Sequence, residues 1–273
     1  MTVDRYAVIG NPIAHSKSPI IHTAFAEATA QRLTYERLLA PIDGFAATVE
    51  RFAAEGGKGL NVTIPFKLEA FALARQRSAR ADSAGAVNTL AWRGDHWFGD
   101  NTDGAGLLRD LMVNLGEVIA GRDVLVFGAG GAARGILQPL LAQAPRRVVI
   151  ANRTHVRAVE LAARFAATAP VTSLEAAALA GSRFDIVFNA TSIGLNAQVP
   201  RDLWPEGLFA EDALAYDLVY ANQATPFMRW ATEQGAAKSA DGLGMLIEQA
   251  AESFLLWRGV RPQTAPVFAL FRD

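Results

Sequence analysis

The residues from Val124 to Arg157 constrain the fold more than any other stretch of this chain. They read VLVFGAGGAARGILQPLLAQAPRRVVIANRTHVR, which is an apolar run, a glycine cluster, a helical segment and a second apolar run. The first run, Val124 to Phe127, is apolar throughout, as a parallel strand buried on both faces requires. The pattern predicts a strand, a turn, a helix beginning near Ala132 and a second strand, which is a mononucleotide-binding unit in outline.

The glycines Gly128, Gly130 and Gly131 follow the first predicted strand directly. Without Cβ, the backbone can turn sharply and a pyrophosphate can approach it closely. The helix that follows directs free N–H groups and its positive dipole end at such a phosphate. A glycine cluster also suits an ordinary strand-to-helix turn, so the motif by itself is a weak signal. Its context on both sides favours a dinucleotide site.

The residues after the second apolar run indicate which dinucleotide is preferred. A unit that binds NAD has an acidic residue there, about 20 residues after the glycines, to accept hydrogen bonds from ribose hydroxyls. This chain has Asn152, Arg153 and Thr154 instead, with Arg157 shortly after. Guanidinium groups and a hydroxyl suit a ribose phosphate, which a carboxylate would repel. The segment therefore predicts NADP, although either arginine alone is equally consistent with a solvated charge.

Length and composition narrow the class of protein. A chain of 273 residues suggests two domains. Half of the residues are hydrophobic (51%) and the formal net charge is −1, so nothing indicates a nucleic acid or a membrane as partner. The absence of cysteine excludes disulfides and thiolate metal ligands, and we predict no metal site. No secretory leader and no run of 18 apolar residues occurs, which favours a soluble, cytoplasmic protein.

Strands and helices are predicted to alternate in the N-terminal part. Strands are expected at 6–9, 33–39 and 60–63, a helix after Pro19 and another at 45–54, with a glycine-rich break at 56–59. This alternation predicts a largely parallel sheet, whose ligands gather at the carboxyl ends of the strands. Five polar side chains fall at these ends: Ser16, Ser18, Asn61, Thr63 and Lys67. The two serines also suit helix capping.

Lys67 and Asp103 are the candidates for proton transfer. A lysine early in a helix is poorly placed for the helix dipole, although a solvated lysine is the simpler alternative. In a partly dry cleft its pKa would fall toward neutrality and it would donate or accept protons. Asp103 begins a predicted helix that runs to about Asn114, so it also suits a helix cap. As a partner of Lys67, it would orient the ammonium group.

Helices, strands and a hairpin are also predicted in the rest of the chain. Residues 70–83 are predicted to continue one helix with a solvated basic face, and 85–90 and 97–100 to form a hairpin. Asn88 in that hairpin suits either an edge strand or a ligand contact. Further strands are expected at 184–188 and 213–219, and helices at 174–180, from Thr225 to about 235, and from 241 to 257. On the last helix Gln249 is expected to face the cleft, whereas Met245 is more typical of a core.

Several strings together resemble one family, the shikimate dehydrogenases. They are GNPIAHSKSP at 10–19, NVTIPFK at 61–67, GAVNT at 85–89, NTDG at 101–104, GAGGAARG at 128–135, NRT at 152–154, NATSIG at 189–194 and GLGMLIEQA at 242–250. They span nearly the whole chain in the family's order. The resemblance implies reversible, NADP-linked reduction of 3-dehydroshikimate to shikimate, with Lys67 and Asp103 as the acid/base pair.

The resemblance also implies roles for other residues. Substrate contacts would come from Ser16, Ser18, Asn61, Thr63, Asn88, Asp103, Tyr220 and Gln249. Cofactor contacts would come from Gly128, Ala129, Gly130, Gly131, Ala132, Asn152, Arg153, Thr154, Arg157, Ala190, Thr191, Leu218, Gly242 and Met245. Two positions depart from the family pattern: Asn222 stands where many members have proline, and Leu218 where methionine is frequent. Both departures concern local loop geometry.

The expected architecture is an α/β protein of two domains. Residues 1–102, completed by 241–273, would form an α/β substrate domain with a mainly parallel sheet, and 103–240 a Rossmann-like, doubly wound NADP-binding domain. Two alternatives remain open: a broader quinate/shikimate dehydrogenase that uses NAD or NADP, and a non-catalytic NADP-binding module. The module would be expected to lack Lys67 or Asp103, and both are present. The chain is expected to act as a monomer or homodimer on a small-molecule substrate.

Overall fold

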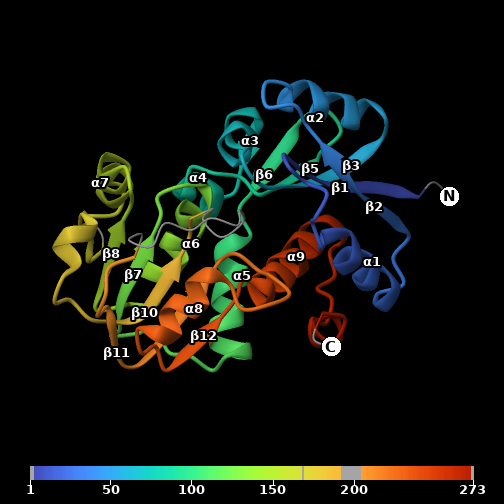
Figure 1. The fold of residues 1–273 in the computed structure, drawn as a ribbon. Coiled ribbons are helices and arrows are strands. Elements are labelled where there is room, and N and C mark those ends of the chain that lie inside the picture. Colours follow the sequence, from blue (N-terminus) through green and yellow to red (C-terminus); the bar gives the residue numbers. More distant parts are fainter. Residues whose placement is uncertain (1–2, 168, 192–203, 272–273) are drawn as a thin grey trace. The chain divides into compact units, whose positions relative to one another are not determined.

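The computed structural model describes residues 3–167, 169–191 and 204–271 (Figure 1). The chain divides into two compact units, here called unit 1 (Met1–Asp110 with Leu246–Asp273) and unit 2 (Leu111–Met245). Residues 103–110 thus belong to unit 1, and 241–245 to unit 2. The described residues contain no helix that is long and apolar enough to cross a membrane.

Unit 1 is built on a mixed, mainly parallel sheet with the strand order β2-β1-β3-β5-β6-β4. The strands are β1 (Asp4–Gly10), β2 (Leu33–Leu39), β3 (Gly57–Val62), β4 (Gln76–Arg77), β5 (Thr89–Trp92) and β6 (Trp97–Asp100). β1 pairs in parallel with β2 and β3, and the predicted hairpin β5–β6 joins β3 in antiparallel fashion. β3 begins earlier than predicted, because Gly57 and Gly59 pair with β1 instead of breaking the chain.

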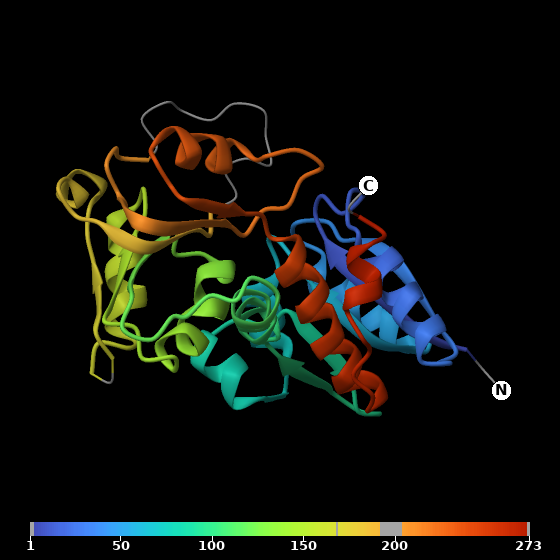
Figure 2. The ribbon, with the colours of Figure 1, turned by 90° about the horizontal axis from the view of Figure 1, so that it is seen from below.

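Helices cover both faces of this sheet (Figures 1 and 2). They are α1 (Ser18–Ala28), α2 (Phe45–Ala54), α3 (Lys67–Leu73), α4 (Ala79–Ala84), α5 (Asp103–Arg109), α9 (Leu243–Arg258) and α10 (Ala265–Phe268), with a π-helical segment at Asp110–Asn114. α2 and α3 pack on one face, where Phe45 and Phe66 stack within the core. α1 and α9 cover the other face, where Phe25 meets Phe254 edge to face. The sheet thereby holds its strand ends in a rigid frame.

The single helix predicted over residues 70–83 is wrong. α3 ends at Leu73, and the chain then runs extended through β4, whose residues Gln76 and Arg77 pair with β6. Ser78 starts α4, because its hydroxyl accepts a hydrogen bond from Ala81 N at 3.2 Å. The prediction of a solvated basic face is also wrong at Arg80. This side chain donates two hydrogen bonds of 2.7 and 2.6 Å to the buried carboxylate of Asp100. Tertiary pairing thus interrupts a locally helical sequence.

Unit 2 is a doubly wound, wholly parallel sheet with the order β12-β11-β10-β7-β8-β9. Its elements are β7 (Asp123–Phe127), α6 (Gly131–Leu141), β8 (Arg147–Ala151), α7 (His155–Ala163), β9 (Val171–Ser173), a 3-10 turn (Ala176–Leu179), β10 (Phe184–Asn189), β11 (Phe209–Asp217), α8 (Pro226–Glu233) and β12 (Lys238–Ala240). The strand order reverses between β7 and β10, which is the topology of a Rossmann fold. The predicted strand–turn–helix–strand unit is confirmed as β7, α6 and β8.

Two boundaries in unit 2 differ from the prediction. β11 starts at Phe209 and ends at Asp217, so Leu218 and Val219 belong to the loop beyond the strand and not to the strand itself. The alanine-rich residues 174–180 form only the short 3-10 turn, not a full helix. Apolar side chains of β7, β10 and β11 pack against α8 through Phe227 and Ala231. This packing holds the carboxyl ends of the same strands in place, where ligands of such a sheet bind.

Candidate active site and nucleotide site

Lys67 and Asp103 form an ion pair within unit 1. The Lys67 ammonium nitrogen lies 2.6 Å from Asp103 Oδ2, and the two side chains are 17% and 6% exposed. Each is the first residue of its helix, α3 and α5 respectively. Thr102 occupies the N-cap position of α5, so the Asp103 carboxylate is not used as a cap. The pair is therefore largely shielded from water, as the acid/base hypothesis requires.

Asn88 holds the other side of the Asp103 carboxylate. Its Nδ2 donates to Asp103 Oδ1 at 2.7 Å, and its Oδ1 accepts a hydrogen bond from Thr102 N at 2.8 Å. The Asn101 side chain accepts from Asp103 N at 3.2 Å. Both carboxylate oxygens of Asp103 thus have a donor, which fixes the orientation of the carboxylate toward Lys67.

Gln249 of α9 joins the same network. Its Oε1 accepts hydrogen bonds from Asn88 Nδ2 and Thr102 Oγ1, both at 3.3 Å, while its Nε2 donates to Leu246 O at 2.8 Å. α5 approaches α9 closely here, since a Cβ on Gly106 would lie 2.6 Å from Gln249 N. Gln249 thus lies among the polar partners of Asp103, and its expected orientation toward a cleft stays a prediction.

Asn61 lies deeper and is fully occupied by protein partners. Its Oδ1 accepts from Tyr35 OH at 2.7 Å and lies 3.1 Å from His22 Nε2. Its Nδ2 donates to Ser253 Oγ at 2.8 Å and Thr89 Oγ1 at 3.2 Å. An amide has four such positions, so all of them are used internally. Burial lowers the pKa of His22 to about 3 and so keeps the ring neutral, although the hydrogen bond with Asn61 opposes this shift.

Five residues of this network were not predicted as site residues from the sequence. They are His22, Tyr35, Thr89, Thr102 and Ser253. Ser253 lies one helical turn after Gln249, so the spacing on α9 carried a signal for it. Tyr35 and His22 carried none, because β2 and α1 bring them to Asn61 only in the folded chain.

Ser16 and Ser18 lie together after β1. The Ser16 hydroxyl is 3.2 Å from that of Ser18, and Arg37 donates two hydrogen bonds of 3.0 and 2.6 Å to Ser16 O. The N-cap of α1 is Lys17, without a side-chain cap, so neither serine serves as that cap. Thr63 follows β3, and its N–H donates to Ile9 O at 3.0 Å. The carboxyl ends of β1 and β3 therefore carry these hydroxyls as predicted.

The glycine turn of unit 2 leaves the start of α6 open. Gly128 has a positive φ of 114°, and a Cβ there would lie 2.8 Å from Ala190 O. Gly130 is the N-cap of α6 and makes no side-chain cap, and a Cβ there would meet no atom within 4 Å. The first N–H groups of α6 are thus available to an anion, and the residues fit the phosphates of a dinucleotide.

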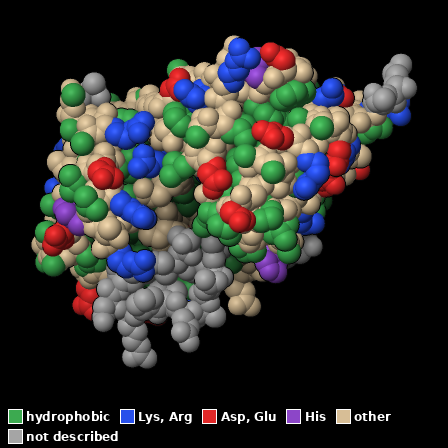
Figure 3. All heavy atoms as spheres, turned by 90° about the horizontal axis from the view of Figure 1, so that it is seen from above, with side chains coloured by type: hydrophobic (Ala, Val, Ile, Leu, Met, Phe, Trp, Pro, Cys, Tyr) green, Lys and Arg blue, Asp and Glu red, His purple; other side chains and the backbone are tan. Residues whose placement is uncertain are grey.

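The connection from β8 to α7 is basic. Arg153, Thr154 and Arg157 are exposed there, and Asn152 Nδ2 donates to Thr154 O at 2.9 Å. Half-buried Arg134 of α6 has a pKa lowered by burial and further by the charge of Arg164. Figure 3 shows Lys and Arg side chains gathered over unit 2, at the left of the view. This environment fits a ribose phosphate and agrees with the predicted preference for NADP.

The remaining predicted cofactor residues flank the ends of β10 and β11. Ala190 N donates to Phe127 O at 2.7 Å, and Leu218 N donates to Asn189 O at 2.9 Å. Gly242 approaches the same loop, where a Cβ would lie 2.3 Å from Leu218 O. Of the other predicted cofactor residues, Thr191 is half-buried after β10 and Met245 is buried near the start of α9. Tyr220, predicted as a substrate contact, is half-buried after β11. Residues 192–194 of the NATSIG string lie outside the described residues.

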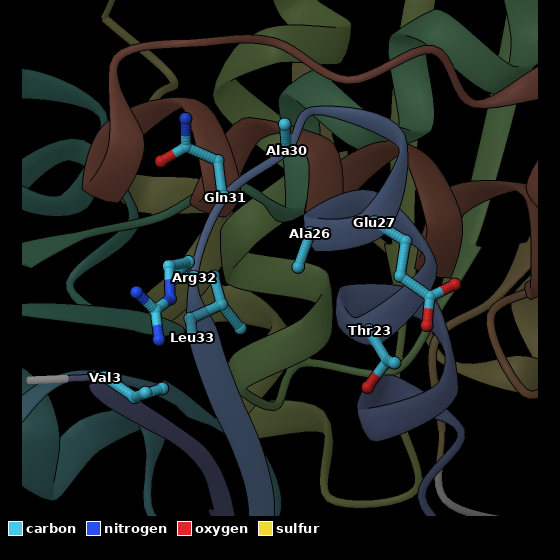
Figure 4. A pocket seen from close by; sticks show the side chains of 8 residues that line it. All are labelled: Val3, Thr23, Ala26, Glu27, Ala30, Gln31, Arg32 and Leu33. Atoms are coloured by element: carbon cyan, nitrogen blue, oxygen red, sulfur yellow. The ribbon is translucent and has the colours of Figure 1, made fainter.

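A surface hollow in unit 1 does not coincide with the predicted site. It measures about 440 Å³ and is lined by Val3, Thr23, Ala26, Glu27, Ala30, Gln31, Arg32 and Leu33 (Figure 4). Val3 directly precedes β1, and the other residues lie on α1, at the start of β2 or in the turn between them, at the amino ends of these strands. The Lys67–Asp103 pair instead follows the carboxyl ends of β3 and β6. The candidate active site is therefore assigned from these two side chains and not from the hollow.

The fold and the site define an α/β dehydrogenase with one Rossmann-type nucleotide unit and one unit that carries a shielded Lys–Asp pair. More particularly, the chain belongs to the shikimate dehydrogenase family. Family models match in order along it: the shikimate dehydrogenase substrate binding domain at 8–90, shikimate / quinate 5-dehydrogenase at 111–202 and the shikimate 5'-dehydrogenase C-terminal domain at 242–267. The resemblance found in the sequence is thereby confirmed.

Individual relatives agree with this membership. The chain is 58% identical over 275 residues to the shikimate dehydrogenase (NADP(+)) of Aromatoleum aromaticum, covering 100% of this chain and 98% of that protein. The structure of an Ael1 enzyme from Pseudomonas putida has a TM-score of 0.88 at 48% identity, covering 99% and 98% of the two chains. A shikimate 5-dehydrogenase from Thermus thermophilus in complex with NADP(H) and shikimate has a TM-score of 0.82 at 32% identity, covering 96% of each chain.

Proposed function

We propose that this chain catalyses the reversible, NADP-dependent reduction of 3-dehydroshikimate to shikimate, a step of the pathway to chorismate and the aromatic amino acids. The observation that carries the proposal is the shielded Lys67–Asp103 pair, with 2.6 Å between nitrogen and oxygen, in a chain of this family. A ketone is reduced by a hydride at carbon and a proton at oxygen. NADPH, when bound, supplies the hydride.

Lys67 supplies the proton. Its ammonium group stabilises the negative charge that develops on the ketone oxygen and then donates a proton to it, leaving a neutral amine that solvent reprotonates. Asp103 accepts a hydrogen bond from Lys67 and so holds the ammonium in position. Asn88 in turn holds Asp103, at 2.7 Å. In the reverse direction the same groups remove the proton from the substrate hydroxyl.

Recognition of the substrate is assigned mainly to hydroxyl and amide side chains, together with the Asp103 carboxylate. The proposed contacts are Ser16, Ser18, Asn61, Thr63, Asn88, Asp103, Tyr220 and Gln249. Hydroxyls and amides suit a ligand with one carboxylate and several hydroxyls, because they both donate and accept hydrogen bonds. For Asn61, a direct contact requires that one of its four present partners give way.

Unit 2 is assigned to the cofactor and, through Tyr220 alone, to the substrate, whereas the other proposed substrate contacts belong to unit 1. The pyrophosphate would lie at residues 128–132, the ribose phosphate at Asn152, Arg153, Thr154 and Arg157, and the nicotinamide half near Ala190, Thr191, Leu218, Gly242 and Met245. The open start of α6 and the basic connection after β8 support this assignment. We further propose a cytoplasmic enzyme that is a monomer or homodimer, so a larger assembly in light scattering would contradict this part.

The function is tested by steady-state rates of the purified chain with shikimate and quinate, each with NADP and with NAD. The highest kcat/KM is expected for shikimate with NADP. Comparable values with quinate or NAD would favour the broader dehydrogenase instead. No rate with any of the four pairs would overturn catalysis and leave a binding module.

A further inference from the structure

Asp217, at the carboxyl end of β11, is a buried carboxylate without a cationic partner. It is 0% exposed. It accepts hydrogen bonds from Thr225 Oγ1 at 2.6 Å, Asn189 Nδ2 at 2.9 Å and Val219 N at 3.1 Å. Within residues 3–167, 169–191 and 204–271 it forms no ion pair. Its charge is therefore solvated only by neutral donors.

Three other buried aspartates, Asp100, Asp103 and Asp123, are paired with cations. Asp100 contacts Arg80, Asp103 contacts Lys67, and Asp123 contacts Arg146, in each case at 2.6 Å. A buried charge is costly unless a charge of opposite sign and hydrogen bonds compensate it. Burial accordingly raises the pKa of Asp217 to about 6 although three donors oppose the shift, and the nearby carboxylate of Asp241 raises it further. At neutral pH the protein thus holds an anion that lacks a cation.

The topology of unit 2 indicates where that cation comes from. A dinucleotide in a Rossmann fold straddles the point at which the strand order reverses. With the ribose phosphate beyond β8 and the pyrophosphate at the start of α6, the nicotinamide half extends over the ends of β10 and β11. Asn189 and Asp217 are the last residues of these two strands. The nicotinamide ring carries a positive charge in NADP⁺ and none in NADPH.

We propose that the Asp217 carboxylate is the counter-charge of the oxidised nicotinamide ring, so that it favours binding of NADP⁺ over NADPH. Asp217 also positions the loops that border the ring, through Asn189 on one side and Val219 and Thr225 on the other. The inference rests on the proposed function for the identity of the cofactor. It assigns to Asp217 a role in the selectivity for NADP⁺ over NADPH and none in proton transfer.

The other charged groups near Asp217 have partners of their own. From the segment before α9, Asp241 accepts hydrogen bonds from Ala221 N and Leu243 N, at 3.3 and 3.2 Å. On β12, the Lys238 ammonium is bound to Glu117 at 2.6 Å, and on α8 an Arg229 N–H donates to Ala224 O. β10 contributes the uncharged Asn189.

The matched test is Asp217→Asn. Asparagine keeps the shape and can accept from Asn189 and Val219 through Oδ1, while its Nδ2 donates to Thr225 Oγ1, which at present donates to Asp217. The substitution therefore removes the charge and reverses one hydrogen bond. Dissociation constants for NADP⁺ and NADPH are measured at pH 8 by fluorescence titration. The constant for NADP⁺ is expected to rise about tenfold, the scale of one charge pair at roughly 10 Å in a partly buried setting. The constant for NADPH is expected to stay unchanged.

A control variant distinguishes the loss of the charge at Asp217 from the loss of a buried charge elsewhere in unit 2. Asp123→Asn removes the same charge from a buried carboxylate at the amino end of β7, the opposite edge of the same sheet. Both dissociation constants should stay unchanged in this variant. Equal weakening of NADP⁺ and NADPH by Asp217→Asn, or an equal selectivity change in Asp123→Asn, would overturn the proposal.

Thermal unfolding of the cofactor-free protein gives a second readout. Because Asp217→Asn removes an uncompensated buried charge, its Tm at pH 8 should lie above that of the wild type. A purely structural carboxylate would instead give a lower Tm, and that result, with unchanged selectivity, would also overturn the proposal.

A measurement on the wild type covers the case in which the variant does not fold. The ratio of the dissociation constants, NADPH over NADP⁺, should rise about tenfold from pH 5 to pH 8 as the carboxyl ionises. The ribose phosphate also titrates near pH 6, but it does so in both forms and cancels in the ratio. A flat ratio would contradict the proposal. Absence of turnover with shikimate would overturn the proposed function while leaving these binding ratios interpretable.

Discussion

Side chains of the candidate site differ in how many of their polar atoms are already hydrogen-bonded to other residues. Asn61 has all four amide positions filled by protein, whereas the Lys67 ammonium is bound, within the described part of the chain, to Asp103 alone. An ammonium carries three N–H groups, so Lys67 retains donors for a substrate oxygen. Asn61 is therefore suited to hold the site together, and Lys67, which has further N–H donors, is suited to perform the chemistry.

Replacing Lys67 with alanine removes the proposed proton donor. Turnover should fall by about 10²–10⁴-fold, the usual contribution of a positioned acid/base group. Affinity for NADP should stay almost unchanged, because the nucleotide is assigned to unit 2. Steady-state kinetics and fluorescence titration check both statements, with Lys58→Ala, an exposed lysine of β3, as the control. Near-normal turnover in Lys67→Ala would refute the assignment.

His22 should make the protein sensitive to acid. Burial lowers its pKa from 6.5 to about 3 in the folded state. The unfolded chain therefore takes up a proton as the pH falls below 6.5 while the folded chain does not, so stability is lost between pH 6.5 and 3. The loss attributable to His22 is about 2 kcal/mol at pH 5.

The measurement compares urea unfolding at pH 7 and pH 5. His22→Phe should show a smaller pH dependence than the wild type, because its ring cannot be protonated. His15→Gln, at an exposed histidine, should behave like the wild type. An identical pH dependence in all three proteins would show that His22 titrates normally.

At the scale of elements, the approach of α5 to α9 decides the position of Gln249. Gly106 permits this approach, because a Cβ would lie 2.6 Å from both Gln249 N and Gln249 Cβ. Similarly, Gly59 of β3 leaves room for the Trp257 indole of α9, where a Cβ would lie 2.5 Å from Nε1. Two glycines without a turn function thus seat α9 on the rest of unit 1.

Gly106→Ala should push these helices apart. We expect a loss of stability of about 1–3 kcal/mol, the usual cost of overpacking, and a higher KM for shikimate as Gln249 leaves Asn88 and Thr102. Urea unfolding and steady-state kinetics test this expectation. Ala105→Ser, half-exposed on the same helix, serves as the control. An unchanged KM would show that the position of Gln249 does not depend on this contact.

For the whole molecule, the proposed cofactor should act as a stabilising ligand. A ligand that binds only the folded state at 100 times its dissociation constant adds about 2.7 kcal/mol of stability. NADP should therefore raise the Tm of the chain, and NAD at the same concentration should raise it less, because NAD lacks the phosphate that Arg153 and Arg157 would bind. Differential scanning fluorimetry measures both shifts. A larger shift with NAD would contradict the predicted selectivity.

Much of the architecture was readable from local pattern. The glycine unit was predicted as β7, α6 and β8, and β2 and α2 were predicted with their observed bounds. The prediction failed at residues 70–83, where pairing of β4 with β6 interrupts a helical sequence. It also placed Leu218 and Val219 in a strand, because an apolar run does not reveal where pairing with a neighbouring strand stops.

The sequence by itself determined the class of fold, the family and the identities of Lys67 and Asp103, because periodicity, glycine spacing and motif order are properties of the linear chain. The tertiary structure alone decided that these two side chains meet at 2.6 Å, that Tyr35 and His22 occupy Asn61, and that Asp217 is buried without a cation from any described residue. These features depend on residues far apart in the chain, which come within hydrogen-bond distance only when both sheets have formed.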